Sequence, residues 1–223
     1  MQNLLFIDRM WNRIEAGRCD SDTTLFTYLM YGAEFFGKLT VASLVSALHE
    51  ERERYRYSQL HRLVRADGIG EWASVMDEIL LGPASQYFPD TLQIEQRELI
   101  QKHITGTWQH DCVANMYYCV SLVEPAIEEL PTKVEAKRWF SLLARLRNKT
   151  RGHGAQQPEI LSKICPFLEA SIREFADNFS LFKKEWAYLH RNLSGKYRVT
   201  KLSSQASRFE HLKKSNVEGL QDG

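Results

Sequence analysis

The sequence lacks the signals of a secreted or membrane-spanning chain. Its four cysteines, at positions 19, 112, 119 and 165, form no CxxC pair and are too scattered for a disulfide framework. The longest uncharged apolar stretches fall well short of the roughly 18 residues that a membrane span needs. Asp8 and Arg9 interrupt the apolar N-terminal run, which is unlike a signal peptide. We therefore expect reduced thiols, no membrane segment and a cytoplasmic location.

The chain also lacks a strong net charge. The formal charge is +1 and the pI is about 7.7, whereas proteins that bind nucleic acid through a broad surface are usually more basic. Any contact with RNA must therefore be local. One segment, 133–151, is strongly basic, because only Glu135 opposes its Lys133, Lys137, Arg138, Arg145, Arg147, Lys149 and Arg151.

Helical periodicity dominates the first 180 residues and predicts a mainly α-helical fold, an antiparallel bundle. The expected helices cover 4–17, 23–48, 58–66, 70–81, 92–104, 109–130, 133–150 and 158–178, with a loop at 82–92. Gly32 and Gly37 are possible breaks in the second helix, and Pro166 is a possible kink in the last. Thr132 is the expected N-cap of the 133–150 helix, with Glu135 as its capping-box partner.

The character of the chain changes after residue 185. Two strand-like runs flank Ser194 and Gly195 between residues 186 and 202, which predicts a β-hairpin. We expect a helical domain over 1–183, with its motif-bearing core at about 95–180. Residues 184–223 would be a hairpin extension or the start of a further domain.

The 133–150 helix carries one side chain in an unusual position. Trp139, Leu142, Leu143 and Leu146 form its apolar stripe, and at about 100° per residue Arg147 lies on the border of that stripe. Arg138 and Arg145 point toward solvent instead. A guanidinium on the border needs a partner, because an isolated charge is costly to desolvate.

His153 follows Arg147 after a sequence that can end the helix. Gly152 and Gly154 flank the histidine, so the backbone can turn there and return the imidazole toward Arg147. Such a pair suits RNA cleavage without a metal or cofactor. RNA carries its own 2′-OH nucleophile, an imidazole can transfer its proton, and a guanidinium can stabilise the charged phosphorane. One histidine is half of an acid–base system, so two copies facing across a dimer would complete the site.

Arg147 and Asn148, followed by four residues and then His153, resemble the Rx4–6H motif of the HEPN superfamily. The resemblance implies a bundle of four or more helices, homodimerisation through the motif helices, and metal-independent endoribonuclease activity in toxins, phage defence or stress responses. It implies catalytic roles for Arg147 and His153, with Asn148 orienting or assisting. Lys149 and Arg151 lie outside the motif, and we expect them to contact RNA phosphates. The tyrosine that marks one regulated toxin subgroup is replaced by Ala155.

Other interpretations of these residues stay open. A basic last turn followed by glycine is also an ordinary helix end. The chain could be a non-catalytic dimerisation or sensing module of a larger defence or signalling protein, or a helical protein that binds nucleic acid or a partner protein through its basic helix alone. His103, His110, Cys112 and Cys119 fit no zinc spacing, so we expect core cysteines and a surface histidine rather than a metal site.

Overall fold

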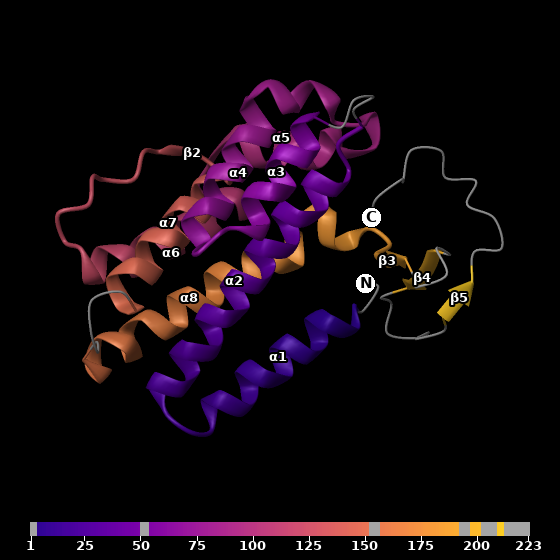
Figure 1. Ribbon diagram of the computed structural model, residues 1–223. Helices are drawn as coiled ribbons and strands as arrows, with labels where there is room; N and C mark the ends of the chain where they lie inside the picture. Colours follow the sequence, from indigo (N-terminus) through magenta and orange to yellow (C-terminus); the bar gives the residue numbers. More distant parts are fainter. Residues whose placement is uncertain (1–3, 50–53, 152–156, 192–196, 202–208, 212–223) are drawn as a thin grey trace.

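The structure is mainly α-helical, as predicted. The computed structural model describes residues 4–49, 54–151, 157–191, 197–201 and 209–211. Within these residues, eight α-helices follow one another (Figure 1): α1 (Leu5–Arg18), α2 (Asp22–Ser46), α3 (Arg54–Val64), α4 (Ile69–Leu81), α5 (Gln93–Ile100), α6 (Trp108–Val123), α7 (Arg138–Arg151) and α8 (Pro158–Asn178). Short 3₁₀-helices, η1 (Pro83–Tyr87), η2 (Asp90–Leu92) and η3 (Ser180–Lys183), join or follow them. No described helix is long and apolar enough to cross a bilayer.

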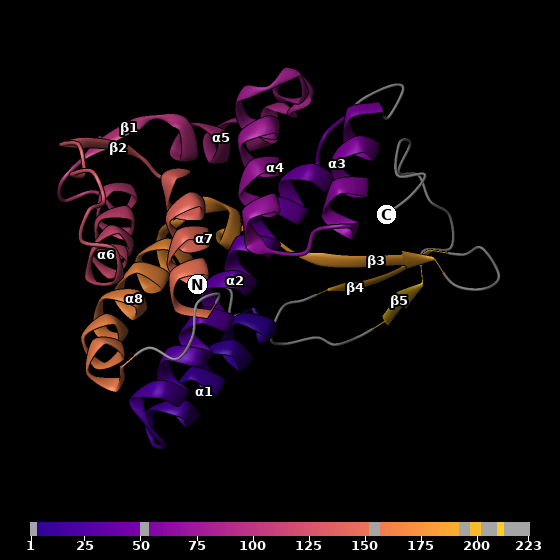
Figure 2. The same ribbon diagram turned by 60° about the vertical axis from the view of Figure 1, so that its left-hand side comes forward.

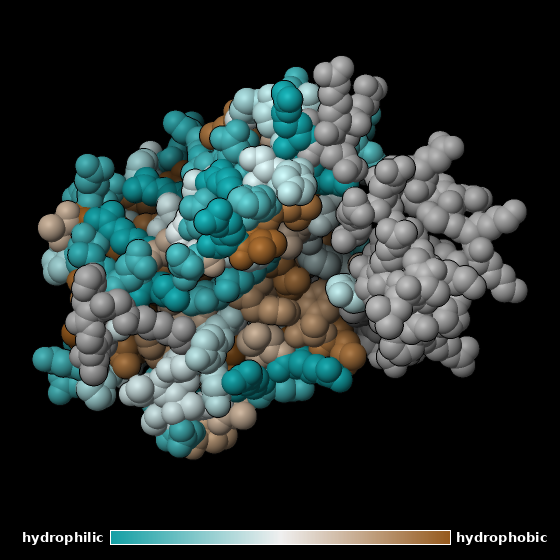
Figure 3. Space-filling view, viewed as in Figure 1, coloured by the Kyte–Doolittle hydropathy of each residue, from teal (hydrophilic) through white to brown (hydrophobic). Residues whose placement is uncertain are grey.

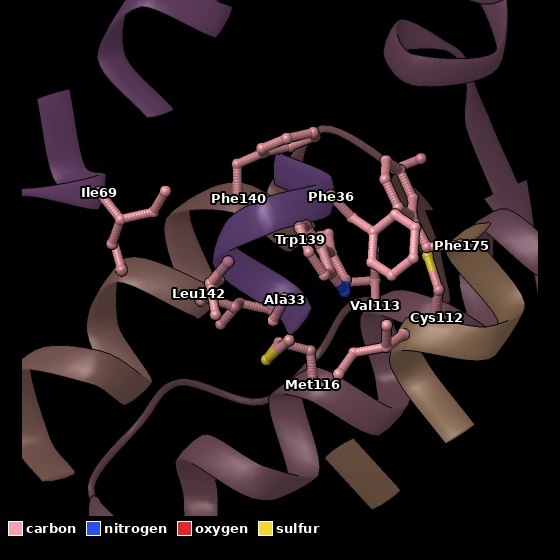
Figure 4. Close-up of a cluster of buried hydrophobic side chains, with 14 of the residues drawn as sticks. Ala33, Phe36, Ile69, Cys112, Val113, Met116, Trp139, Phe140, Leu142 and Phe175 are labelled. Atoms are coloured by element: carbon pink, nitrogen blue, oxygen red, sulfur yellow. The ribbon is translucent and has the colours of Figure 1, made fainter. Parts of the chain in front are cut away.

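The core lies where α8 packs against α6 and α2, and where α7 packs against α6 and α4 (Figure 2). Trp139 on α7 is fully buried at its centre (Figure 4), and its ring stacks on Phe175 with centroids 4.7 Å apart. The indole Nε1 donates to Ser171 Oγ at 2.9 Å, and that hydroxyl donates to the Cys112 carbonyl oxygen at 2.6 Å. The only polar atom of this large side chain is therefore satisfied inside the core.

Helix α2 runs unbroken through Gly32 and Gly37, so the possible breaks predicted there are wrong. A Cβ at Gly32 would lie 3.1 Å from the Ile14 side chain of α1, and one at Gly37 would lie 3.6 Å from Trp139. These glycines sit where neighbouring elements approach α2 closely. Burial of about half of the residues of α2, the two glycines included, compensates for their weak helix propensity. Helix α8 likewise continues through Pro166.

Three predictions for the segment between α5 and α7 are wrong. Residues 102–104 are not helical but form β1 (Lys102–Ile104), which pairs antiparallel with β2 (Lys133–Glu135). Helix α6 ends at Val123, so the predicted extension to 130 is wrong. Helix α7 starts at Arg138, so Thr132 and Glu135 form no capping box at its start. Pairing with β1, about 30 residues away, has overridden the local capping pattern, as tertiary contacts commonly do.

The C-terminal hairpin prediction is confirmed in its pairing. Strand β3 (Ala187–Arg191) pairs antiparallel with β4 (Tyr197–Lys201), and β5 (Phe209–His211) adds a third strand that was not predicted. Trp186, just before β3, stacks on Phe182 with centroids 5.9 Å apart and meets Phe6 of the N-terminal helix edge-on at 5.6 Å. In the view of Figure 3, the broadest apolar surface lies over α1 and α2.

Candidate functional site

Arg147 lies on the border of the buried face of α7, as predicted. Its neighbours Leu143 and Leu146 are fully buried, whereas 31% of the Arg147 side chain is exposed. The guanidinium Nε donates to Glu34 Oε1 of α2 at 3.0 Å, and only 13% of the Glu34 side chain is exposed. Glu34, 113 residues away in the sequence, is therefore the partner that a partly desolvated guanidinium needs.

Two further residues, one on α2 and one at the start of α4, lie near the Arg147–Glu34 pair. Lys38, one turn along α2, places its Nζ 3.8 Å from Glu34 Oε2. A Cβ built on Gly68, at the N-terminal end of α4, would lie 3.7 Å from Arg147 Nη1. The guanidinium is thus held between α2 and the start of α4. Its bond to Glu34 uses one of its five N–H donors.

Asn148 lies beside Arg147 but faces another surface. Its exposed side chain lines a cleft of about 550 Å³ between the end of α7 and the turn that joins α3 to α4. Figure 2 shows this turn beside the C-terminal half of α7. His61, Arg65 and Asp67 line the same cleft. These three residues could not be predicted from the sequence, because no spacing connects them to the Arg147–His153 motif.

Lys149 points away from Arg147, toward the end of α6. Its Nζ lies 3.5 Å from Glu124 Oε1, and Arg145 Nε donates to Glu124 Oε2 at 2.6 Å. The bond from Arg145, helped by Lys149, lowers the pKa of Glu124 to about 2. The proposed phosphate contact Lys149 and the motif residue Arg147 therefore lie on different flanks of α7.

Two predicted site residues fall at the limit of the described chain. Arg151 is the last residue of α7, and its side chain is not described. His153 lies outside the described residues, and so does its predicted approach to Arg147. Between them and Arg147, Thr150 is buried and its Oγ donates to the Leu146 carbonyl oxygen at 2.8 Å. This local bond belongs to the helix end and leaves the hydroxyl without a role in a site.

The one histidine and the two cysteines of α6 are buried. Cys112 and Cys119 are fully buried, as expected, and burial raises the pKa of both thiols. His110 is also buried, so the expectation of a surface histidine is wrong there; its Nδ1 lies 3.1 Å from Asp111 Oδ1. Among the described residues, no three His, Cys, Asp or Glu side chains group closely enough to hold a metal ion.

Comparisons with protein-family models, curated proteins and solved structures found no match for this chain.

Proposed function

We propose that this protein is a metal-independent endoribonuclease of the HEPN type, an antiparallel helical bundle that cleaves RNA as a homodimer. The observation that carries the proposal is the half-buried guanidinium of Arg147, oriented by Glu34 in the last two turns of α7. It stands at the arginine position of the Arg–Asn–x₄–His pattern. An arginine needed only for solubility would sit on the exposed face, as Arg145 does.

The bond to Glu34 gives Arg147 a fixed orientation before substrate arrives. A carboxylate bonded at Nε limits rotation of the planar guanidinium and leaves the Nη donors to other acceptors. Donors held in advance stabilise developing charge without reorganising during the reaction. In this proposal, Arg147 donates to the non-bridging oxygens of the pentavalent phosphorane.

His153 supplies proton transfer. The 2′-oxygen bonds to phosphorus while the bond from phosphorus to the 5′-oxygen breaks, so the products carry a 2′,3′-cyclic phosphate and a 5′-OH. One imidazole accepts the 2′-OH proton, and a second, protonated imidazole donates a proton to the 5′-oxygen. The two copies of His153 in a dimer formed through the motif helices would supply both groups.

The remaining predicted residues take supporting roles. Asn148 assists at the site, and Lys149 and Arg151 contact phosphates elsewhere on the strand. Lys149 would act on the Glu124 flank of α7, where 42% of its side chain is exposed. The proposal assigns the activity to the cytoplasm, in a toxin system, phage defence or a stress response, as the resemblance implies.

The direct test is cleavage of single-stranded RNA in EDTA by the purified full chain. We expect 2′,3′-cyclic phosphate and 5′-OH ends, and we expect His153→Ala to abolish cleavage while the circular dichroism spectrum and dimer mass stay unchanged. Arg147→Lys keeps a positive charge opposite Glu34 but removes the guanidinium fork, so it should lower kcat at least about 100-fold, in the range reported for lost oxyanion donors. A matched control is Arg145→Lys, which changes the exposed Glu124 pair and should leave cleavage unaffected.

The alternative is a non-catalytic dimerisation or sensing module. One observation favours it: the Arg147–Glu34 bond is also what a purely structural arginine at this position would make. A folded dimer that leaves a panel of single-stranded RNAs intact would establish this alternative. RNA binding without cleavage, lost in Lys149→Glu with Arg151→Glu, would instead favour a binding protein that uses its basic helix.

A further inference from the structure

The cleft beside Asn148 contains groups that the proposed cleavage does not use. We call it the α3–α4 cleft; its volume of about 550 Å³ is within the range of small-ligand sites. It is lined by His61, Arg62, Arg65, Ala66, Asp67, Gly68, Gly70, Glu71 and Asn148.

One wall of the α3–α4 cleft is already engaged in hydrogen bonds. Arg62 donates from Nε to Glu71 Oε1 at 2.8 Å and from Nη2 to Ser74 Oγ at 2.8 Å. The charges of Arg62 and Glu71 neutralise each other, and their bond joins α3 to α4 across the turn. The side chains of Arg65, Asp67 and Asn148 differ, because none of them has a hydrogen bond or ion pair with another residue of the described chain. Their donors and acceptors can therefore meet a ligand.

The charge of the α3–α4 cleft argues against a simple anion site. The positive charges of its two arginines balance the negative charges of its two carboxylates, and Asn148 is neutral. One cation, one carboxylate and one amide, all unengaged, can instead bond the edge of a nucleobase and its flanking phosphate.

A flat aromatic surface adjoins these groups. Tyr57 is 70% exposed, and its ring stacks on His61 with centroids 6.5 Å apart and an interplanar angle of 25°. Exposed aromatic faces bind unpaired bases of single-stranded RNA by stacking. Tyr57 and His61 thus extend the cleft with a surface on which a base can stack.

We propose that the α3–α4 cleft binds one unpaired nucleotide of the RNA substrate next to the scissile phosphate. Asp67 and Asn148 would bond the edge of the base, and Arg65 the phosphate beside it. This inference rests on the proposed function, because Gly68 forms part of both the cleft and the surroundings of Arg147. A strand with its scissile phosphate at Arg147 would bring a neighbouring base to the cleft, which would set the sequence preference of cleavage.

The test uses the full-length protein and four fluorescent 2′-O-methyl oligoribonucleotides of uniform sequence (A, C, G or U), which lack the nucleophile and cannot be cleaved. We expect wild-type affinities, measured by anisotropy, to differ at least about fivefold among the four bases. Asp67→Ala and Asn148→Ala should reduce this difference to within about twofold, and Arg65→Ala should weaken all four complexes by a similar factor of about five. Arg9→Ala, which removes an exposed arginine of α1, is the matched control and should change nothing.

The outcomes separate this inference from the proposed function. If unmodified RNA is cleaved but Asp67→Ala and Asn148→Ala leave both base preference and cleavage positions unchanged, the nucleotide site is wrong and the ribonuclease remains. If the expected binding pattern appears without cleavage of unmodified RNA, the nucleotide-binding cleft stands and the ribonuclease is wrong. Equal affinity of the wild type for all four oligomers overturns the role in base recognition. Because all three side chains are exposed, the melting temperatures of the variants should match the wild type.

Discussion

The two flanks of α7 each place basic side chains against a glutamate from another helix, but in different surroundings. On one flank Arg147 meets Glu34, whose side chain is only 13% exposed. On the other, Arg145 and Lys149, both more than 40% exposed, converge on Glu124 at the end of α6. The carboxylate and the cations are both more exposed on the second flank, 21% for Glu124 against 13% for Glu34 and 43% for Arg145 against 31% for Arg147, so water and salt screen the second group more than the first. The same pairing chemistry should therefore stabilise the contact between helices more on the α2 flank than on the α6 flank.

The contrast also bears on function. A pair that is partly shielded from water can hold a guanidinium in one orientation, which is what stabilisation of a transition state needs. An exposed cluster can attract an anionic strand but cannot orient it closely. The α2 flank is thus the better candidate for chemistry, and the α6 flank for a peripheral phosphate contact.

The largest effect should come from breaking the sheltered pair. Glu34→Ala leaves the Arg147 guanidinium partly buried without its carboxylate, and we expect a loss of about 2 kcal/mol in the free energy of unfolding. Urea denaturation monitored by circular dichroism measures this change in the free energy of unfolding. Arg147→Met fills similar volume without charge, so the double variant should recover part of the loss. Wild-type stability in Glu34→Ala would mean that the pair is as weak as a surface pair.

A smaller effect is expected when the exposed cluster is broken. Glu124→Ala should destabilise the protein less than Glu34→Ala does, because water solvates the released Arg145 and Lys149. Raising the salt concentration to 1 M, where the Debye length is about 3 Å, should remove most of that loss. The effect of Glu34→Ala should change less with salt. Equal salt sensitivity of the two variants would contradict the difference between the flanks.

The smallest effect concerns pH. The pKa of Glu124 is lowered from 4.5 to about 2 in the folded chain. Its contribution to stability is therefore fully present above the unfolded value, near pH 4.5, and is lost as pH falls toward 2. Carbon-detected NMR titration of the Glu124 carboxyl group should give the low value, and Arg145→Ala should return it toward 4.5. A midpoint near 4.5 in the wild type would show that the cluster does not form in solution.

Much of the helical framework could be predicted from the chain alone. The periods of α1, α2, α4 and α8 come from residues only three or four apart, so spacing reveals them. Prediction failed at 102–104 and at 124–137, on either side of α6, where β1 and β2 pair across about 30 residues. The candidate site also combines a feature that local sequence predicts with contacts that it does not predict. The angle of Arg147 on α7 is a local property, but the cleft residues His61, Arg65 and Asp67 reach Asn148 only through the fold.

The sequence alone was enough to predict the mainly helical class, the C-terminal hairpin and the position of Arg147 at the edge of an apolar stripe. Each depends on backbone periodicity and on the spacing of near neighbours. Three contacts depend on the folding of the whole chain: Glu34 accepts from Arg147, Lys149 approaches Glu124, and the α3–α4 turn forms a cleft with Asn148. These contacts join residues at least 25 positions apart, and packing of the whole core, rather than local preference, brings them together.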